Sequence, residues 1–163
     1  MAAEVTDDLR AVERWASTLL AQLSPSGQRK ALLDVSRDLR RSQQTRIAAQ
    51  KNPDGSRYKP RKPKGQGSAK NLRGKAGRIK RQKMFAKLRT SRYMQVEATG
   101  EGLAIGFAGR VARIARIHQL GELAQVAPKG PMALYPARVL LGFSDTDREL
   151  IRDRLLHHIT KRP

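Results

Sequence analysis

The pattern of apolar positions predicts an amphipathic helix at the start of the chain. Apolar side chains recur at steps of three and four residues from position 9 to position 23, and Trp15 lies beside them. Asp7 or Asp8 could cap the free backbone amides at the start of this helix. The pattern therefore indicates a first helix with one face turned towards a core.

A second helix is predicted to begin at Ser24 and Pro25 and to run to about Gln50. Pro25 fits the first helical turn, where its missing N–H costs nothing, and Ser24 or Ser26 can cap. The apolar stripe of this helix is sparse, and its arginines lie largely off the stripe. The stripe consists of Leu32, Leu39 and Ile47, and the arginines are Arg37, Arg40, Arg41 and Arg46. Because the connection is short, we expect the two helices to form an antiparallel pair.

The second helix is predicted to end in a turn and to give way to a long loop. A residue before proline disfavours helix, and Pro53-Asp54-Gly55 is typical of a turn. From residue 56 to residue 77, prolines and glycines are interspersed with Lys and Arg, and only Leu72 is a strong core candidate. Low hydrophobicity combined with high charge predicts a flexible basic arm here.

Helical and strand patterns return after the loop. A short basic helix is predicted over residues 79–88, because its apolar residues fall along one edge. Two alternating runs over residues 93–107, around Gly100-Glu101-Gly102, predict a β-hairpin. Another short helix fits residues 111–120, and Gly121 is its predicted terminator.

The C-terminal part is predicted as a loop, a strand and a helix. Prolines and a glycine predict a loop over residues 128–136, and residues 139–141 are predicted as a third, short strand. Ser144, followed by acidic residues, is typical of the start of a helix. Four apolar positions of that helix are expected to face the core: Leu150, Ile151, Leu155 and Ile159.

Together these patterns predict a single α+β domain. A helical pair (1–50) precedes the basic arm (51–78), and an α+β part follows (79–163), with a small antiparallel sheet, its hairpin and a C-terminal helix. Only seven aromatic residues are present, so the core must be mainly aliphatic. With the arm outside it, this core is small for a monomer, which favours oligomerisation.

The positive charge is concentrated in one segment. Residues 51–92 contain sixteen Lys or Arg and a single carboxylate, Asp54, and so carry +15 of the formal net charge of +20. Two partners fit such a segment: phosphates of a nucleic acid, bound without sequence choice, or an acidic protein surface. Tyr58 and Phe85 are too few to form a base-stacking platform. The candidate contact residues are Lys59, Arg61, Lys62, Lys64, Lys70, Arg73, Lys75, Arg78, Lys80, Arg81 and Lys83.

Patterns of catalysis, metal binding and membrane insertion are not found. The absence of cysteine excludes disulfides, thiolate metal sites and a cysteine nucleophile, and no His-x3-His pair, calcium loop or nucleophile elbow is present. His118 is interpreted as a structural polar group at a helix end, and His157 and His158 as last-turn residues that interact with the final carbonyls. No secretory signal or membrane-spanning run is visible. We expect no cofactor and no enzymatic activity.

Four phrases, in this order and spacing, resemble the phage virion morphogenesis family. They occupy residues 47–60, 84–89, 115–121 and 136–144. The patterns within them are Gln-x-Asn-Pro-Asp-Gly, His-Gln-x-Gly and Pro-Ala-Arg-x-x-Leu-Gly. The matching positions that we interpret as structural are Pro53, Asp54, Gly55, His118, Gly121, Pro136 and Arg138.

The resemblance implies a structural protein of the phage neck, of the tail-completion type found in contractile-tailed phages. Such a protein completes the tail and joins it stably to the head, with no enzymatic activity. The resemblance also implies a homo-oligomeric ring, hexameric or larger, that contacts the end of the tail tube or sheath and head-connector proteins. The expected location is the virion, and the host cytoplasm during assembly.

The role of the basic segment does not follow from the resemblance. Between Lys59 and Lys83 the segment is longer and more basic than the family pattern requires. In a ring it would face either packaged DNA in the channel or an acidic neighbouring protein. The alternative function is a free nucleic-acid-binding protein that uses residues 51–92 without sequence specificity.

Overall fold

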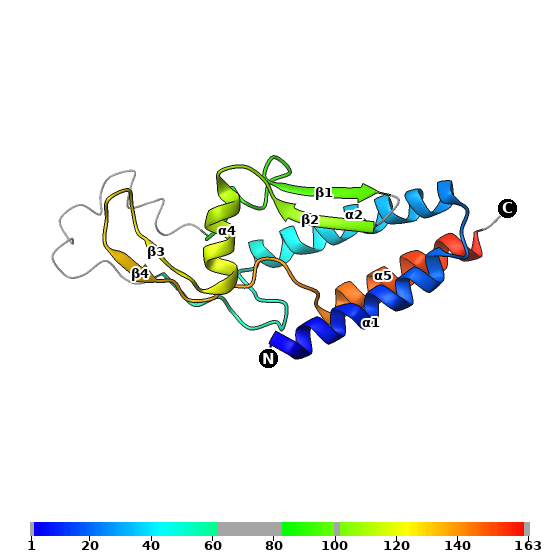
Figure 1. The fold of residues 1–163 in the computed structure, drawn as a ribbon, viewed down its shortest axis with the longest axis horizontal. Helices are drawn as coiled ribbons and strands as arrows, with labels where there is room; N and C mark the ends of the chain where they lie inside the picture. The colour runs from blue at the N-terminus through cyan, green and yellow to red at the C-terminus, as the bar shows by residue number, and fades with distance from the viewer. Residues whose placement is uncertain (1, 62–82, 100–101, 162–163) are drawn as a thin grey trace.

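The computed structural model describes residues 2–61, 83–99 and 102–161, and it shows an elongated α+β molecule with helices near both ends of the chain, as predicted (Figure 1). One end consists of three helices: α1 (Ala2–Leu20), α2 (Pro25–Ala48) and α5 (Asp145–Thr160). A first hairpin, β1 (Met94–Thr99) and β2 (Gly102–Phe107), packs on α2. The other end carries α4 (Val111–Leu120) and a second hairpin, β3 (Leu123–Gln125) and β4 (Met132–Leu134).

The second helix begins as its sequence predicts. Ser24 has an extended backbone, and its side chain accepts a hydrogen bond from the backbone N–H of Gly27 at 3.3 Å, with Pro25 in the first turn. All three positions of the predicted apolar stripe are buried, namely Leu32, Leu39 and Ile47. The stripe therefore faces a core along the whole length of α2.

The first helix differs from the prediction in its start and in its partner. Because α1 begins at Ala2, Asp7 and Asp8 lie inside it and neither is the N-cap. The expected antiparallel pair of α1 and α2 is also not the main contact, since α5 packs against both of them. The shared cluster contains Ala31, Val35, Leu39, Ile151 and Leu155, with apolar residues of α1 against it. The C-terminal helix therefore completes the helical unit.

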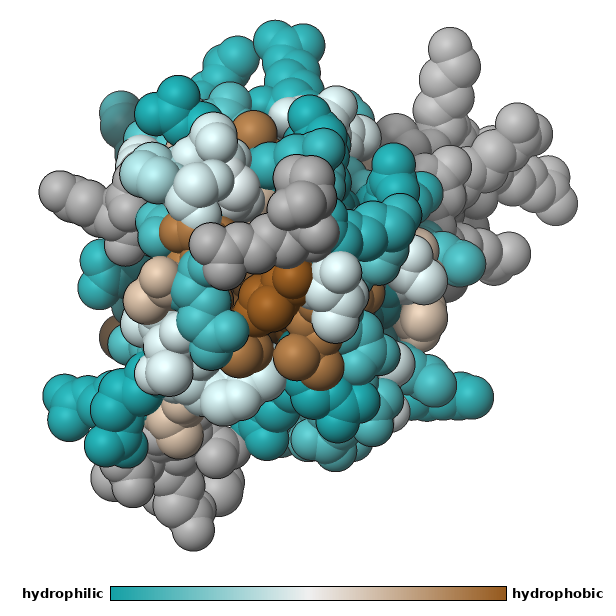
Figure 2. Space-filling model, turned by 90° about the vertical axis from the view of Figure 1, so that its right-hand side faces the viewer, coloured by the Kyte–Doolittle hydropathy of each residue, from teal (hydrophilic) through white to brown (hydrophobic). Residues whose placement is uncertain are grey.

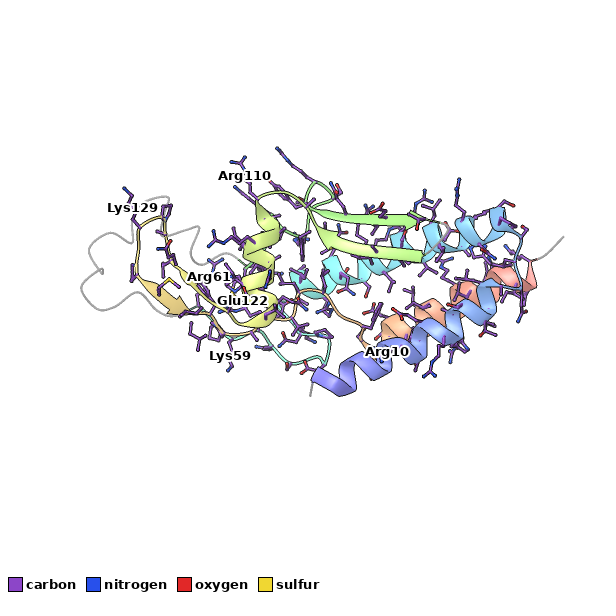
Figure 3. All side chains as sticks on the ribbon, in the orientation of Figure 1. Arg10, Lys59, Arg61, Arg110, Glu122 and Lys129 are labelled. Atoms are coloured by element: carbon purple, nitrogen blue, oxygen red, sulfur yellow. The ribbon has the colours of Figure 1, made fainter. Side chains whose placement is uncertain are left out.

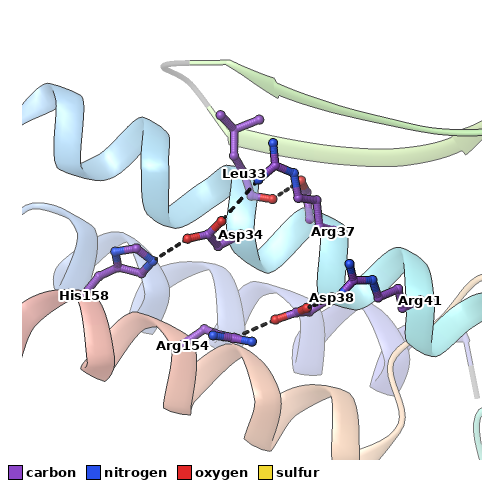
Figure 4. A network of polar contacts seen from close by, with 8 residues as sticks. Leu33, Asp34, Arg37, Asp38, Arg41, Arg154 and His158 are labelled. Carbon is purple, nitrogen blue, oxygen red and sulfur yellow. Dashed lines mark hydrogen bonds and ion pairs between the residues drawn. The ribbon is translucent and has the colours of Figure 1, made fainter.

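An ion pair and a histidine–carboxylate hydrogen bond lie along the contact between α2 and α5 (Figure 4). Arg154 Nε lies 2.5 Å from Asp38 Oδ2, and His158 Nε2 lies 3.1 Å from Asp34 Oδ2. His158 thus sits in the last turn as predicted, but it contacts a carboxylate of α2. Because partly exposed ion pairs contribute about 0–1 kcal/mol each, the buried aliphatic residues provide most of the stability here.

Both α5 and the first hairpin follow their sequence patterns. Ser144 and Asp147 form a reciprocal capping box at the start of α5. Strands β1 and β2 pair antiparallel, from Met94 opposite Phe107 to Thr99 opposite Gly102. In β1 the side chains alternate between partly or fully buried and exposed, so one face of the hairpin covers α2.

Three local predictions are wrong. The described part of the expected 79–88 helix, from residue 83, forms turns instead, and the positive φ of Phe85 (63°) is incompatible with an α-helix. The expected loop at 128–136 contains strand β4, paired with β3. Residues 139–141 form no strand, and residue 141 lies in a bend, because side chains rather than a neighbouring strand bind their backbone.

Candidate functional site

Residues 138–142, which we call the strap, belong to no helix or strand and run through the middle of the molecule without a sheet partner. Leu140 is 0% exposed and belongs to a core cluster with Ile47, Tyr58 and Met94. A buried backbone must find hydrogen-bond partners, because an unpaired N–H or C=O costs about 1–3 kcal/mol. Side chains from α2, α4 and the turn after α2 provide most of these partners.

Amide side chains bind the strap from two directions. Gln119 of α4 accepts from the N–H of Leu140 (2.7 Å) and of Leu141 (3.0 Å), and donates to the Leu141 carbonyl (2.7 Å). Asn52 accepts from the N–H of Val139 at 2.9 Å. Gln119 therefore pairs with the strap much as a neighbouring strand would.

Arg46 binds the opposite edge of the strap. Its Nη1 donates to the Val139 carbonyl and its Nη2 to the Leu140 carbonyl, each at 3.0 Å. Desolvation lowers the pKa of Arg46, an effect partly offset by Tyr58 and two carboxylates. Arg46 is therefore a half-buried structural residue, a role that its predicted position off the apolar stripe does not reveal. Gln43, one turn earlier, donates to the Gly142 carbonyl at 2.8 Å.

Side chains next to the strap also bind the backbone on both sides of residues 62–82. On one side, Arg138 Nε donates to the Lys59 carbonyl (2.7 Å), and its Nη2 donates to the Pro60 carbonyl (3.2 Å). On the other side, the side chain of Gln50 accepts from the N–H of Met84 (2.8 Å) and donates to its carbonyl (2.9 Å). Arg138 and Gln50 thus hold the described residues on both sides of residues 62–82.

Four rings connect these anchors. Tyr58, Phe85, His118 and Tyr135 form a chain of edge-to-face contacts, with successive centroids 5.8, 4.9 and 5.1 Å apart. Tyr58 is buried, contrary to the prediction that only Leu72 of this loop is a strong core candidate; Leu72 itself lies outside the described residues. Tyr58 and Phe85 therefore pack inside the fold.

His118 is electrically neutral in this environment. Burial, followed by the charges of Arg138 and Arg61, lowers the pKa of His118 from its ordinary value of 6.5 to about 4. Its Nδ1 lies 3.0 Å from Nη1 of Arg138, a distance suited to acceptance of a hydrogen bond by the neutral ring. The geometry thus places His118 as an acceptor for Arg138 rather than as a free acid or base.

Glycines permit the close packing of the strap. Gly121 ends α4 with φ 72°, and a Cβ there would lie 3.0 Å from the backbone nitrogen of Ala137. A Cβ on Gly142 would lie 2.8 Å from a ring carbon of Pro53. The Pro53-Asp54-Gly55 turn forms as predicted, with Gly55 N–H donating to the Asn52 carbonyl at 3.0 Å.

The basic residues proposed as contacts divide into two groups. Lys59, Arg61 and Lys83 are exposed, and the first two lie close to α4 and the second hairpin (Figure 3). Arg110 and Lys129 lie at the same end of the molecule, whereas Arg10 lies on α1. The remaining candidates lie outside the described residues: Lys62, Lys64, Lys70, Arg73, Lys75, Arg78, Lys80 and Arg81.

Two features are absent from the described residues: a metal-binding cluster and a membrane-spanning helix. Within residues 2–61, 83–99 and 102–161, no group of three or more His, Cys, Asp or Glu could hold a metal ion. In the same ranges, no helix has the length and hydrophobicity needed to cross a membrane. Sequence reasoning missed Arg46, Gln50 and Gln119 as scaffold residues. The sequence feature that could have identified them is a polar side chain beside the apolar face of a helix or at the end of a helix.

The family phrases meet at this scaffold. Asn52 and Gly55 come from the first phrase, Met84 and Phe85 from the second, His118 and Gln119 from the third, and Arg138 to Gly142 from the last. The model of the phage virion morphogenesis family matches residues 7–160. The chain is also 38% identical over 144 residues to tail completion protein S of Escherichia phage P2, which covers 88% of this chain and 91% of that protein. No solved structure gives a significant match.

Proposed function

Because the chain belongs to the phage virion morphogenesis family, we propose that it is a structural protein that completes the phage tail. The observation that carries this proposal is the similarity over nearly the whole chain to tail completion protein S. The protein acts without catalysis, as a subunit of a homo-oligomeric ring at the head-proximal end of the tail. There it contacts the tube or sheath end and the head connector, and makes the head–tail joint stable.

We assign different roles to the body of the subunit and to its basic arm. The three helices and the first hairpin form the body of the subunit, and the scaffold around the strap anchors a basic arm between Pro60 and Met84. The cations from Lys59 to Lys83 bind a negatively charged surface, either DNA in the channel or an acidic neighbouring ring. Anchoring both ends limits the volume that the arm searches, which lowers the entropic cost of binding.

Deletion of the gene from the phage that carries it tests the main proposal. The expected result is filled heads and unjoined or incomplete tails in electron micrographs of the lysate, with infectivity restored by the wild-type gene in trans. Intact infectious particles from the deletion strain would rule out the tail-completion role.

The role of the arm needs a charge-matched comparison. One variant replaces Lys62, Lys64, Lys70 and Arg73 by glutamine, and the control replaces four cations of the helical unit, Arg10, Arg14, Arg29 and Lys30. We expect the arm variant to fold normally but to give far fewer joined particles than the control. Equal particle yields from both variants would exclude a specific role for the arm.

A DNA-binding measurement on the purified protein distinguishes DNA from an acidic protein as the partner of the arm. Contact with phosphates predicts affinity for any duplex that falls steeply with salt, with a log–log slope of about −5 to −10 if that many phosphates are neutralised. No binding at low salt would leave an acidic protein as the partner. Strong DNA binding by a protein absent from finished particles would instead favour the alternative of a free nucleic-acid-binding protein.

A further inference from the structure

The second hairpin turns its large apolar side chains towards solvent. Leu123 lies opposite Leu134 in the antiparallel register, and Gln125 lies opposite Met132. Because paired residues share a face and alternate along a strand, these four side chains line one face of the hairpin. Leu123, Met132 and Leu134 are 60%, 55% and 66% exposed, so this face has no partner among the described residues.

The opposite face of the hairpin carries only small side chains. Ala124 and Ala133 form the middle pair, and Ala124 is buried. A two-stranded hairpin of three residues per strand is marginal in water without a covered apolar face. In this hairpin the large apolar side chains lie on the exposed face. Such an exposed apolar face is typical of a surface that another subunit covers in an assembly.

The exposed apolar residues are unequally distributed over the described chain. Nine large apolar side chains of the described residues are exposed, and six of them lie on α4 or the second hairpin: Ile114, Leu120, Leu123, Val126, Met132 and Leu134. The other three, Trp15, Leu33 and Leu156, lie on the helical unit. Figure 2 also shows apolar surface ringed by polar residues at the helical end of the molecule. Apolar surface on both parts of the molecule suits contact between unlike surfaces of two copies.

A groove on the helical unit can receive such a patch. It lies between α1 and α5, has a volume of about 350 Å³, and is lined by Ala11, Val12 and Trp15 together with Arg148, Glu149 and Arg152. Its walls are apolar on the α1 side and charged on the α5 side. Trp15 is the only tryptophan of the chain and is 38% exposed, so it presents a large apolar surface there.

Charge selects between two arrangements of the copies. Residues 109–134, with α4 and the second hairpin, carry four cations and one carboxylate, and the basic segment is attached beside them. The three helices instead hold ten of the fourteen carboxylates against eleven cations. Hairpin-to-hairpin contact would bring two strongly positive ends together, whereas hairpin-to-helix contact brings a positive end to a nearly neutral one.

We propose that the exposed face of the β3–β4 hairpin docks into the α1–α5 groove of a second copy of this chain, with Leu123 and Leu134 against Trp15. The contact is heterologous, and repetition of such a contact closes a ring when the rotation between copies allows. This assignment rests on the oligomeric state proposed above and names the surface that forms it.

Substitutions at both surfaces test the proposal by sedimentation velocity of the full-length protein. The double variant Leu123→Ser/Leu134→Ser and the single variant Trp15→Ser should each weaken association roughly tenfold or more. The matched control, Leu33→Ser, removes an exposed leucine that does not line the groove and should leave association unchanged. Circular dichroism melting checks that each variant is folded.

Cross-linking tests which surfaces meet, and its result does not depend on whether the serine variants fold normally. Because the chain has no cysteine, Leu134→Cys and Ala11→Cys each introduce a single thiol. A mixture of the two proteins treated with a short bis-maleimide should give a cross-linked dimer, and Leu134→Cys alone should not. Ser91→Cys, an exposed position outside both surfaces, replaces Ala11→Cys in the control mixture and should give no dimer.

Three results would overturn the assignment. They are a cross-link of Leu134→Cys to itself, unchanged association of the double serine variant, and a wild-type chain that stays monomeric at all concentrations. The tail-completion role is scored separately, by joined particles in the deletion strain, so these results leave that role standing. A failed deletion test, in turn, does not affect the cross-linking result.

Discussion

The strap and the second hairpin are both short segments outside the helices, yet the hairpin, which has a strand partner, is exposed, whereas the strap, which has none, is buried. The hairpin has a regular antiparallel ladder but leaves Leu123 and Leu134 exposed. The strap has no strand beside it, but Leu140 is fully buried. Side chains such as Gln119 and Arg46 take the place of a ladder there.

This difference shows that a backbone ladder and a core contribute separately to stability. Ladder bonds exchange for bonds to water, so each contributes only about 1 kcal/mol net. Buried backbone groups cannot make that exchange, and losing a partner costs the full desolvation penalty. The strap should therefore be sensitive to loss of single polar side chains, and the hairpin should tolerate surface changes in the isolated subunit.

The largest expected effect is at Gln119. Gln119→Leu leaves two N–H groups and one carbonyl of the strap without a partner, and should lower the free energy of unfolding by about 3–5 kcal/mol. The matched control is Gln125→Leu, which changes an exposed glutamine of the hairpin and should cost less than about 0.5 kcal/mol. Urea denaturation measures both. Similar losses of unfolding free energy in the two variants would contradict the proposed difference between the strap and the hairpin.

A pair of glycines gives the next largest effect. Gly121 and Gly109 both have positive φ (72° and 68°), but only at Gly121 would a Cβ approach a neighbour closely, the backbone of Ala137. Backbone strain should cost each alanine variant about 1–2 kcal/mol, and overpacking should add about 1–2 kcal/mol at Gly121. Thermal unfolding of Gly121→Ala and Gly109→Ala isolates the packing contribution. Equal melting temperatures would show that Ala137 moves aside freely.

His118 makes the strap region sensitive to acid. Its pKa is about 4 in the folded protein and 6.5 ordinarily, so between these values the unfolded chain binds a proton that the folded chain does not. Stability is therefore lost as pH falls from about 6.5 to 4, by about 2 kcal/mol after allowance for partial exposure. Comparing urea denaturation at pH 7 and pH 4.5 measures the loss, which His118→Gln should reduce. An unchanged pH dependence in that variant would assign the loss to other groups.

The smallest expected effect on the isolated subunit is at the hairpin. Leu134→Ser removes a side chain that is 66% exposed, so the monomer should change in unfolding free energy by no more than about 0.5 kcal/mol. Denaturation at concentrations too low for association measures this value. A loss of 2 kcal/mol or more would mean that this leucine stabilises its own subunit, and that the hairpin resembles the strap after all.

Elements with a strong local signal could be predicted from the sequence. The start of α2 next to Pro25, the apolar stripe of α2, the pairing of the first hairpin and the end of α4 at Gly121 depend on residues close together in the chain. The turn at Pro53 to Gly55 has the same local origin. The fold class followed because such elements were recognised in the right order.

Elements that depend on distant residues could not be predicted. Residues 139–141 have the composition of a strand, but their hydrogen-bond partners include side chains of α2 and α4, all more than twenty positions away in the chain. Phe85 adopts a positive φ in a segment with helical composition, where its ring packs between Tyr58 and His118. In both segments, the packing of buried side chains outweighs the local conformational propensity of the residues.

The sequence by itself determined the α+β class, the family and the concentration of charge between residues 51 and 92, because composition, order and spacing are properties of the chain alone. Only the tertiary structure decided that α5, not α1, is the main helical partner of α2, that Arg46 and Gln119 bind the strap, and that the second hairpin exposes its leucines. The physical reason is that burial and hydrogen-bond partners are set by residues far apart in sequence, which meet only when the chain is folded.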